Sequence, residues 1–127
     1  MIYTSSIKEN SEFTRVYKNG RHYAGKNLIL YVLNSKPDCI ELGLTASKKV
    51  GKSVRRNRVK RLIKENYRLF EPYVRTGYMF VIVVRARQDK ILPDYHEIHR
   101  EMKSLFIRAG VFDQQQWENS LNGASSP

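Results

Sequence analysis

Residues 48–61 read Lys-Lys-Val-Gly-Lys-Ser-Val-Arg-Arg-Asn-Arg-Val-Lys-Arg and lead into the most regular pattern of the chain. From the end of this stretch onward, apolar residues recur three and four positions apart: Val59, Leu62, Ile63, Tyr67 and Phe70. Such spacing places them on one face of an amphipathic helix. We expect this helix over residues 54–70, with Ser53 as its N-cap and Pro72 just after its end.

The same stretch is basic at eight positions and contains no acidic residue: Lys48, Lys49, Lys52, Arg55, Arg56, Arg58, Lys60 and Arg61. A helix N-terminus carries a partial positive charge, so Asp or Glu would stabilise its first turn. Arginines occupy that turn here. A bound anion such as phosphate would complete the arrangement. The alternative, a solvated charged face, is disfavoured because no acid accompanies these cations.

Composition indicates one domain with an anionic partner. The 127 residues include 23 Lys and Arg against 12 Asp and Glu, which gives a net charge of +11. Such an excess points to nucleic acid or to an anionic membrane surface. We expect nucleic acid and no membrane, because the longest apolar run, at residues 79–84, is far too short to span a bilayer.

Two further features predict a cytoplasmic protein. Residues 1–10 are polar and lack the apolar core of a secretory signal. Cys39 is the only cysteine, so it has no intrachain disulfide partner, as expected in a reducing compartment.

Patterning along the chain predicts a single-domain α+β fold, an α/β sandwich in which a small sheet is covered by helices. Helices are expected at residues 10–18, 54–70 and 94–110, and strands at 27–34, 40–46 and 78–84. The strand at 40–46 is expected to pair antiparallel with its neighbour, and the apolar strand at 78–84 to be central. We assign residues 1–112 to the domain and residues 113–127 to a polar, flexible tail, in which Trp117 and Leu121 can dock one helical turn.

No catalytic group stands out in the polypeptide. Paired carboxylates, a histidine-based nucleophile and a metal cluster are all missing from the pattern. His96 and His99 are three residues apart but have no third clustered ligand. A ribonuclease that uses His22 or His99 with a lysine stays an alternative. We expect the polypeptide itself to break no bond, to hold no cofactor or metal and to have no small-molecule substrate.

Three aromatic residues suggest how single-stranded RNA is held. Phe13 and Tyr17 lie at positions i and i+4 of the first helix, and Tyr31 lies in a strand that this helix can cover. Bases of single-stranded RNA stack on such rings beside basic groups. Taken alone, rings at this spacing are more often ordinary core.

Three separated motifs resemble the bacterial ribonuclease P protein family. They are Phe13-Thr-Arg-Val-Tyr17-Lys-Asn-Gly20, Gly43-Leu-Thr-Ala-Ser-Lys48-Lys49-Val50-Gly51 and Arg56-Asn57-Arg58-Val59-Lys60-Arg61-Leu62. The resemblance covers residues 10–112 and includes the family's Arg-Asn-Arg motif in the same context. Residues after 112 match nothing in the family.

The resemblance implies a subunit of a ribonucleoprotein endoribonuclease. In this family a catalytic RNA, ribonuclease P RNA, holds magnesium and removes the 5′ leader from precursor tRNA. The protein binds that RNA through the region matching residues 52–61 and holds the leader in a cleft between the sheet and the first helix. Phe13, Tyr17 and Tyr31 match the aromatic positions of that cleft, and Lys48 and Lys49 match basic residues at its edge.

The resemblance also implies a mixed sheet of about four strands and a left-handed βαβ crossover around the basic helix. Asn57 has two open roles: its amide contacts RNA, or it holds the first turn of the helix. The alternative function is a ribosomal or other structural RNA-binding protein without a processing role.

Overall fold

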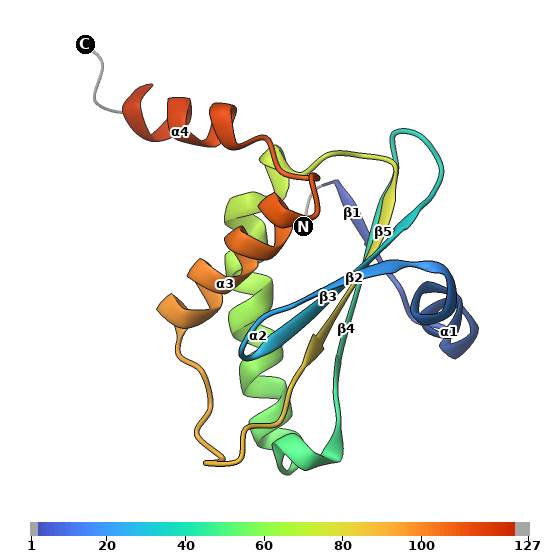
Figure 1. Ribbon diagram of the computed structural model, residues 1–127, viewed down its shortest axis with the longest axis vertical. Helices are drawn as coiled ribbons and strands as arrows, with labels where there is room; N and C mark the ends of the chain where they lie inside the picture. The colour runs from blue at the N-terminus through green and yellow to red at the C-terminus, as the bar shows by residue number, and fades with distance from the viewer. Residues whose placement is uncertain (1–2, 124–127) are drawn as a thin grey trace.

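The computed structural model describes residues 3–123, which form one mixed sheet with helices on both faces (Figure 1). The strands are β1 (Thr4–Ser6), β2 (Arg21–Ala24), β3 (Leu28–Asn34), β4 (Ile40–Ala46) and β5 (Tyr78–Val84). The helices are α1 (Asn10–Asn19), α2 (Ser53–Phe70), α3 (Tyr95–Arg108) and α4 (Gln114–Gly123), with short 3-10 turns at Lys48–Val50 and Glu71–Tyr73.

Within the described residues the sheet has five strands, in the order β1-β4-β5-β3-β2. β5 lies at its centre, as its apolar sequence predicted. The prediction that β4 pairs antiparallel with its neighbour was wrong, because β4 is parallel to both β1 and β5. The long α2 returns the chain to the starting edge of the sheet, which makes parallel pairing possible. β1 and β2 were missed because they are short and mostly polar, with little apolar alternation.

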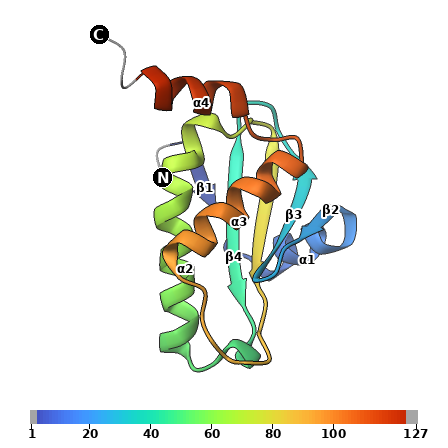
Figure 2. The same cartoon turned by 60° about the vertical axis from the view of Figure 1, so that its left-hand side comes forward.

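The crossover from β4 through α2 to β5 is left-handed (Figure 2). In Figure 2 the face covered by α2 is turned toward the viewer, β4 lies to the left of β5, and both strands run downward. A connection that passes in front of such strands from left to right is left-handed, against the usual rule. This is the crossover that the family resemblance implied.

Two apolar clusters hold the layers together. The larger lies between the sheet and α2 with α3, where Tyr67, Phe70, Phe80 and Phe106 are fully buried. The smaller lies between the sheet and α1 and is built around Val16 and Val81. Because α1 covers only part of its face, ring surface beside it stays open to solvent.

The start of α2 differs from the sequence prediction. Lys52, and not Ser53, is the N-cap of α2, and no side chain caps this end. Ser53 begins the helix instead. At α3, by contrast, Asp94 and Glu97 form a capping box at the expected position.

Much of the segment assigned to a polar tail is helical, and Trp117 docks as the sequence allowed. The segment forms α4, where Trp117 is buried against Phe70 and Tyr73 at ring-centroid distances of 5.2 and 5.3 Å. Leu121, the other residue expected to dock, is exposed. Residues 124–127 of the predicted tail lie outside the described residues. None of the helices within residues 3–123 is long and apolar enough to cross a membrane.

Candidate RNA-binding surfaces

The N-terminal half of α2 presents a basic surface, by which we mean the eight cations of residues 48–61. Val59 and Ile63 are fully buried and fix which side of the helix faces the sheet. Lys48 and Lys49 lie exposed in the 3-10 turn directly after β4, and Lys52 is exposed at the helix N-cap. Along the helix Arg58 and Arg61 are exposed, whereas Arg55, Arg56 and Lys60 are half-buried.

Arg55 is held by the protein itself. Its guanidinium donates to the carbonyl oxygens of Val50, at 3.4 Å, and of Lys90. Gly51 makes room for it: this residue has a φ of 139°, and a Cβ there would meet the Arg55 side chain at 2.7 Å. Arg55 therefore ties the start of α2 to the segment that joins β5 to α3.

The residues of the Arg-Asn-Arg motif have different surroundings. Arg56 carries a buried Nε that has no hydrogen-bond partner within residues 3–123. Asn57 is exposed, and its amide makes no hydrogen bond to any described residue, so it does not cap the first turn of α2. Arg58 is exposed and forms no ion pair in the described chain. These side chains can therefore accept an external partner without losing an internal one.

The three predicted aromatic residues do lie together, on the opposite face of the sheet. The ring of Tyr17 lies 5.0 Å from that of Tyr31, edge to face, and 6.4 Å from that of Phe13. Tyr17 is 39% exposed, and the other two are half-buried. We call these three residues with His22 the aromatic row. His22, exposed and 5.5 Å from Tyr31, was not predicted here, although its position opposite Tyr31 on β2 places it beside that ring.

Gly43 leaves room for the Phe13 ring, which forms one end of the aromatic row. A Cβ on Gly43 would come within 2.6 Å of the Phe13 ring, so the ring lies directly on the backbone of β4. Burial raises the pKa of Tyr17, and Tyr31 adds to this effect, while a hydrogen bond with Thr45 opposes it. Tyr17 thus stays neutral, with its hydroxyl beside β4.

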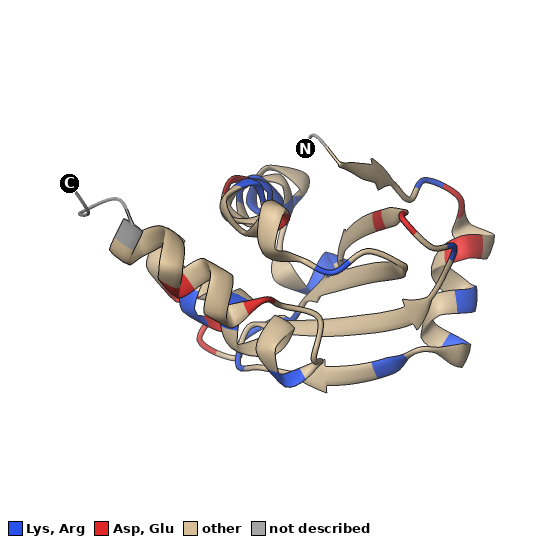
Figure 3. Cartoon of the chain, turned by 90° about the horizontal axis from the view of Figure 1, so that it is seen from above, with Lys and Arg blue, Asp and Glu red and all other residues tan. Residues whose placement is uncertain are grey.

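The aromatic row and the basic surface meet at the end of β4. Thr45 of this strand contacts Tyr17 on one face, and the chain then enters the turn that carries Lys48 and Lys49. Figure 3 shows Lys and Arg along α2 and on α1. A flexible anionic chain lying on the aromatic row would therefore have cations at its side.

The groups considered for catalysis lie in separate places among residues 3–123. No group of three or more His, Cys, Asp or Glu there is placed to hold a metal ion. His22 lies in the aromatic row, whereas His99 lies between α2 and α3, where its Nδ1 is 2.9 Å from Oδ1 of Asn66. The two histidines thus lie in different parts of the fold, and a ribonuclease that uses one of them with a lysine stays a prediction.

Comparison with known proteins agrees with these features. The family model for ribonuclease P matches residues 1–110. The ribonuclease P protein component of Clostridium kluyveri is 42% identical over 106 residues, covering 84% of this chain and 95% of that protein. That of Clostridium beijerinckii is 40% identical over 129 residues, covering 96% and 100%.

Solved structures show the same fold. The RNase P protein of Staphylococcus aureus, in a mutant with defective mRNA degradation activity, superposes with a TM-score of 0.75 at 30% identity, covering 87% of this chain and 91% of that one. The Thermotoga maritima RNase P protein, at 21% identity, gives a TM-score of 0.73 and supports the fold alone. With the matching family model and relatives, this chain belongs to the ribonuclease P protein family, as an accessory protein subunit that partners ribonuclease P RNA in an endoribonuclease of tRNA processing.

Proposed function

We propose that the chain binds ribonuclease P RNA through the basic surface of α2 and holds the 5′ leader of precursor tRNA on the aromatic row. The observation that carries the proposal is the row itself: Tyr17 and its neighbours leave ring surface open on a face that α1 covers only in part. A ring used only as core would be buried on both sides.

The proposal divides the chemistry between protein and RNA. The polypeptide supplies arginine forks for phosphates and rings for bases. Magnesium ions held by the catalytic RNA supply the hydrolytic step, and the polypeptide holds no metal. The leader passes along the row, with Lys48 and Lys49 beside it, and the assembly works in the cytoplasm.

The test compares two RNAs that differ only in the leader. Tyr17→Ala and Tyr31→Ala are assayed for binding of precursor tRNA and mature tRNA, each in complex with ribonuclease P RNA. Loss of one stacked base costs about 1–3 kcal/mol of binding. We expect precursor affinity to fall by that amount and mature affinity to stay unchanged.

Tyr3→Ala is the matched control, because this tyrosine is 62% exposed and lies away from the row, in the segment before α1. It should leave both affinities unchanged. Parallel losses for precursor and mature tRNA in the Tyr17 and Tyr31 variants would overturn the leader assignment. Failure of the wild-type chain to support cleavage by the RNA at low magnesium would overturn the wider proposal.

A further inference from the structure

A recess lies beside the basic surface, on the side of α2 away from β1. It is formed by α2 and the segment 85–94, which joins β5 to α3, and we call it the loop groove. Its lining includes Arg58, Leu62, Lys90, Ile91, Leu92 and Tyr95. Of the residues that line it, Arg55 and Arg58 were predicted to bind RNA, and the aromatic row uses none of them.

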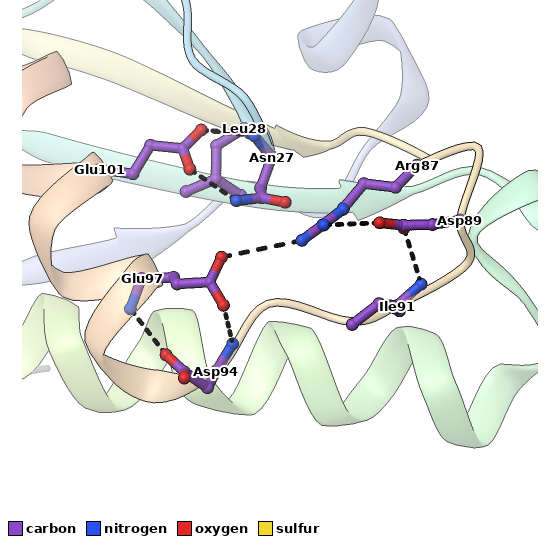
Figure 4. A network of polar contacts seen from close by, with 8 residues as sticks. All are labelled: Asn27, Leu28, Arg87, Asp89, Ile91, Asp94, Glu97 and Glu101. Carbon is purple, nitrogen blue, oxygen red and sulfur yellow. Dashed lines mark hydrogen bonds and ion pairs between the residues drawn. The ribbon is translucent and has the colours of Figure 1, made fainter.

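The outer wall of the loop groove is fixed by polar contacts (Figure 4). Arg87 binds Asp89 at 2.7 Å and lies 3.7 Å from Glu97 of α3. Asp89 also accepts a hydrogen bond from the Ile91 backbone N–H at 3.0 Å. These two contacts, first the backbone one, lower the pKa of Asp89. Arg55 closes the wall from the helix side through the Lys90 carbonyl. The wall is thus formed before any ligand arrives.

The charge of the loop groove is positive. Asp94, its acidic residue, already accepts the Glu97 backbone N–H at 2.8 Å as the cap of α3. Asp89 is taken by Arg87. Arg58 and Lys90 have no acidic partner, because both ion pairs within residues 3–123 belong to Arg87. An anionic occupant would neutralise them.

Apolar and aromatic surface lies between these cations. The side chain of Ile91, which follows Lys90 in the chain, is 61% exposed. The side chains of Leu62 and Leu92, which also line the loop groove, are half-buried. The ring of Tyr95 is half-buried, and its hydroxyl makes no hydrogen bond to the described chain. Val54, four residues before Arg58 on the same side of α2, is 78% exposed. Cations together with apolar and ring surface fit a nucleotide, which has a phosphate and a flat base.

We propose that the loop groove receives one unpaired nucleotide of the ribonuclease P RNA, with its base against Ile91 and Tyr95 and its phosphate between Arg58 and Lys90. The proposal rests on the proposed function, in that α2 faces the RNA. It adds a site that binds a base, next to the basic surface, whose side chains are mainly charged. An RNA is favoured over an acidic protein because the ring and the exposed Ile91 suit a base better than a carboxylate side chain.

The experiment measures binding of the full-length chain to ribonuclease P RNA across a salt series. Ile91→Ser alters only an exposed side chain and should weaken binding roughly tenfold without changing the salt slope, because no phosphate contact is lost. Lys90→Asn should lower the slope by about one contact. Asn is chosen because Lys90 has a φ of 58°, which Asn tolerates. Leu69→Ser, 47% exposed near the other end of α2, is the control and should bind as wild type.

A chemical map of the RNA gives the second readout. Wild-type protein should protect one unpaired nucleotide from 2′-hydroxyl acylation, and Ile91→Ser and Tyr95→Leu should release that protection. Wild-type affinity and protection in both variants would overturn the loop-groove proposal. So would a glutamate-rich peptide whose binding depends on Ile91 while RNA binding does not. If instead wild-type protein shows no salt-dependent binding of this RNA, the proposed function itself fails.

Discussion

At the scale of single residues, the aromatic row depends on the lack of a side chain at Gly43. Gly43 is buried in β4, and the Phe13 ring occupies the space where a Cβ would lie. Neither residue alone predicts this contact, because it forms between a helix and a strand far apart in sequence. The position of Phe13, and with it one end of the row, is therefore set from β4.

Gly43→Ala should displace the Phe13 ring. The Cβ of the new alanine would lie 2.6 Å from the Phe13 ring, which is closer than real Cβ contacts, so the ring must move. We expect lower thermal stability and weaker binding of precursor tRNA, with mature tRNA unaffected. The double variant Gly43→Ala/Phe13→Leu should recover stability, since the smaller side chain makes room. If Gly43→Ala alone has the melting temperature and the precursor tRNA affinity of wild type, the packing of Phe13 on Gly43 is contradicted.

His99 is a second residue whose state follows from its neighbours. The amide of Asn66 donates through Nδ2 to the Leu62 carbonyl at 3.0 Å, which turns its Oδ1 toward His99. Nδ1 of the imidazole therefore carries the proton and donates it. Burial lowers the pKa of His99, and the cations Lys103 and Arg100, with His96, add to the effect.

Stability should consequently fall in mild acid through His99. Its pKa is lower in the folded chain than the usual 6.5 or so of an unfolded chain, so the unfolded state binds the proton more readily. The contribution of neutral His99 to the free energy of unfolding is complete above about pH 6.5 and is lost as the pH falls through the folded-state pKa of His99. Urea midpoints of His99→Gln should depend less on pH than those of wild type or of the exposed control His96→Gln. Equal pH dependence in all three chains would reject this role.

At the scale of elements, strong patterns were predicted and weak ones were not. α2, α3, β3 and β5 combine long apolar periodicity with clear ends, and each was placed within a few residues. β1 has three residues and exists only through its pairing with β4, so its own sequence carries no signal. Strand direction likewise depends on where α2 returns the chain, which local propensity does not encode.

α4 shows the same limit, since its sequence is polar except for a few residues. Trp117 supplies its attachment: the ring packs among Phe70, Tyr73 and Phe112, with the Lys103 ammonium 5.9 Å from its centroid. One anchoring ring thus turns a segment that composition predicts to be loose into a docked helix.

Trp117→Ala should therefore destabilise the whole domain. Large-to-small changes of buried aromatic residues cost about 3–5 kcal/mol, and we expect the lower end because the buried Nε1 has no partner within the described chain. Leu121→Ala, on the exposed side of α4, should change the free energy of unfolding by less than about 0.5 kcal/mol. Urea denaturation measures both. A Trp117 variant as stable as the Leu121 variant would show that α4 is not anchored by this ring.

At the scale of the whole molecule, the sheet separates the two surfaces that we propose bind RNA. The aromatic row lies on the face of α1, and the basic surface lies on the face of α2 (Figure 1). The sequence predicted the basic residues and three of the four members of the aromatic row, because rings and charges are visible as residue types. It did not predict that Arg55 would bind the Lys90 carbonyl or that His22 would join Tyr31, because both contacts depend on the tertiary fold.

The net charge of +11 makes assembly with RNA sensitive to salt. Each phosphate contact contributes about −0.7 to −0.9 to the slope of log affinity against log salt. Arg56→Ala/Arg58→Ala should flatten this slope by up to two such contacts and weaken binding of ribonuclease P RNA. Arg68→Ala, in the last turn of the same helix, is the matched control and should change neither quantity. An unchanged slope in the double variant would remove both arginines from the interface.

The short outer strands have a consequence for the life of the protein before it meets its RNA. β1 and β2 close the two sides of the sheet with three and four residues, and most of their exposed positions are polar: Ser5, Ser6, Arg21 and His22, with Ala24 as the exception. Long apolar borders would invite another copy to add strand to strand, whereas short polar ones offer little to extend. The short polar edges thereby protect the RNA-free subunit against edge-to-edge aggregation, and the mutual repulsion of its positive charges adds to that protection.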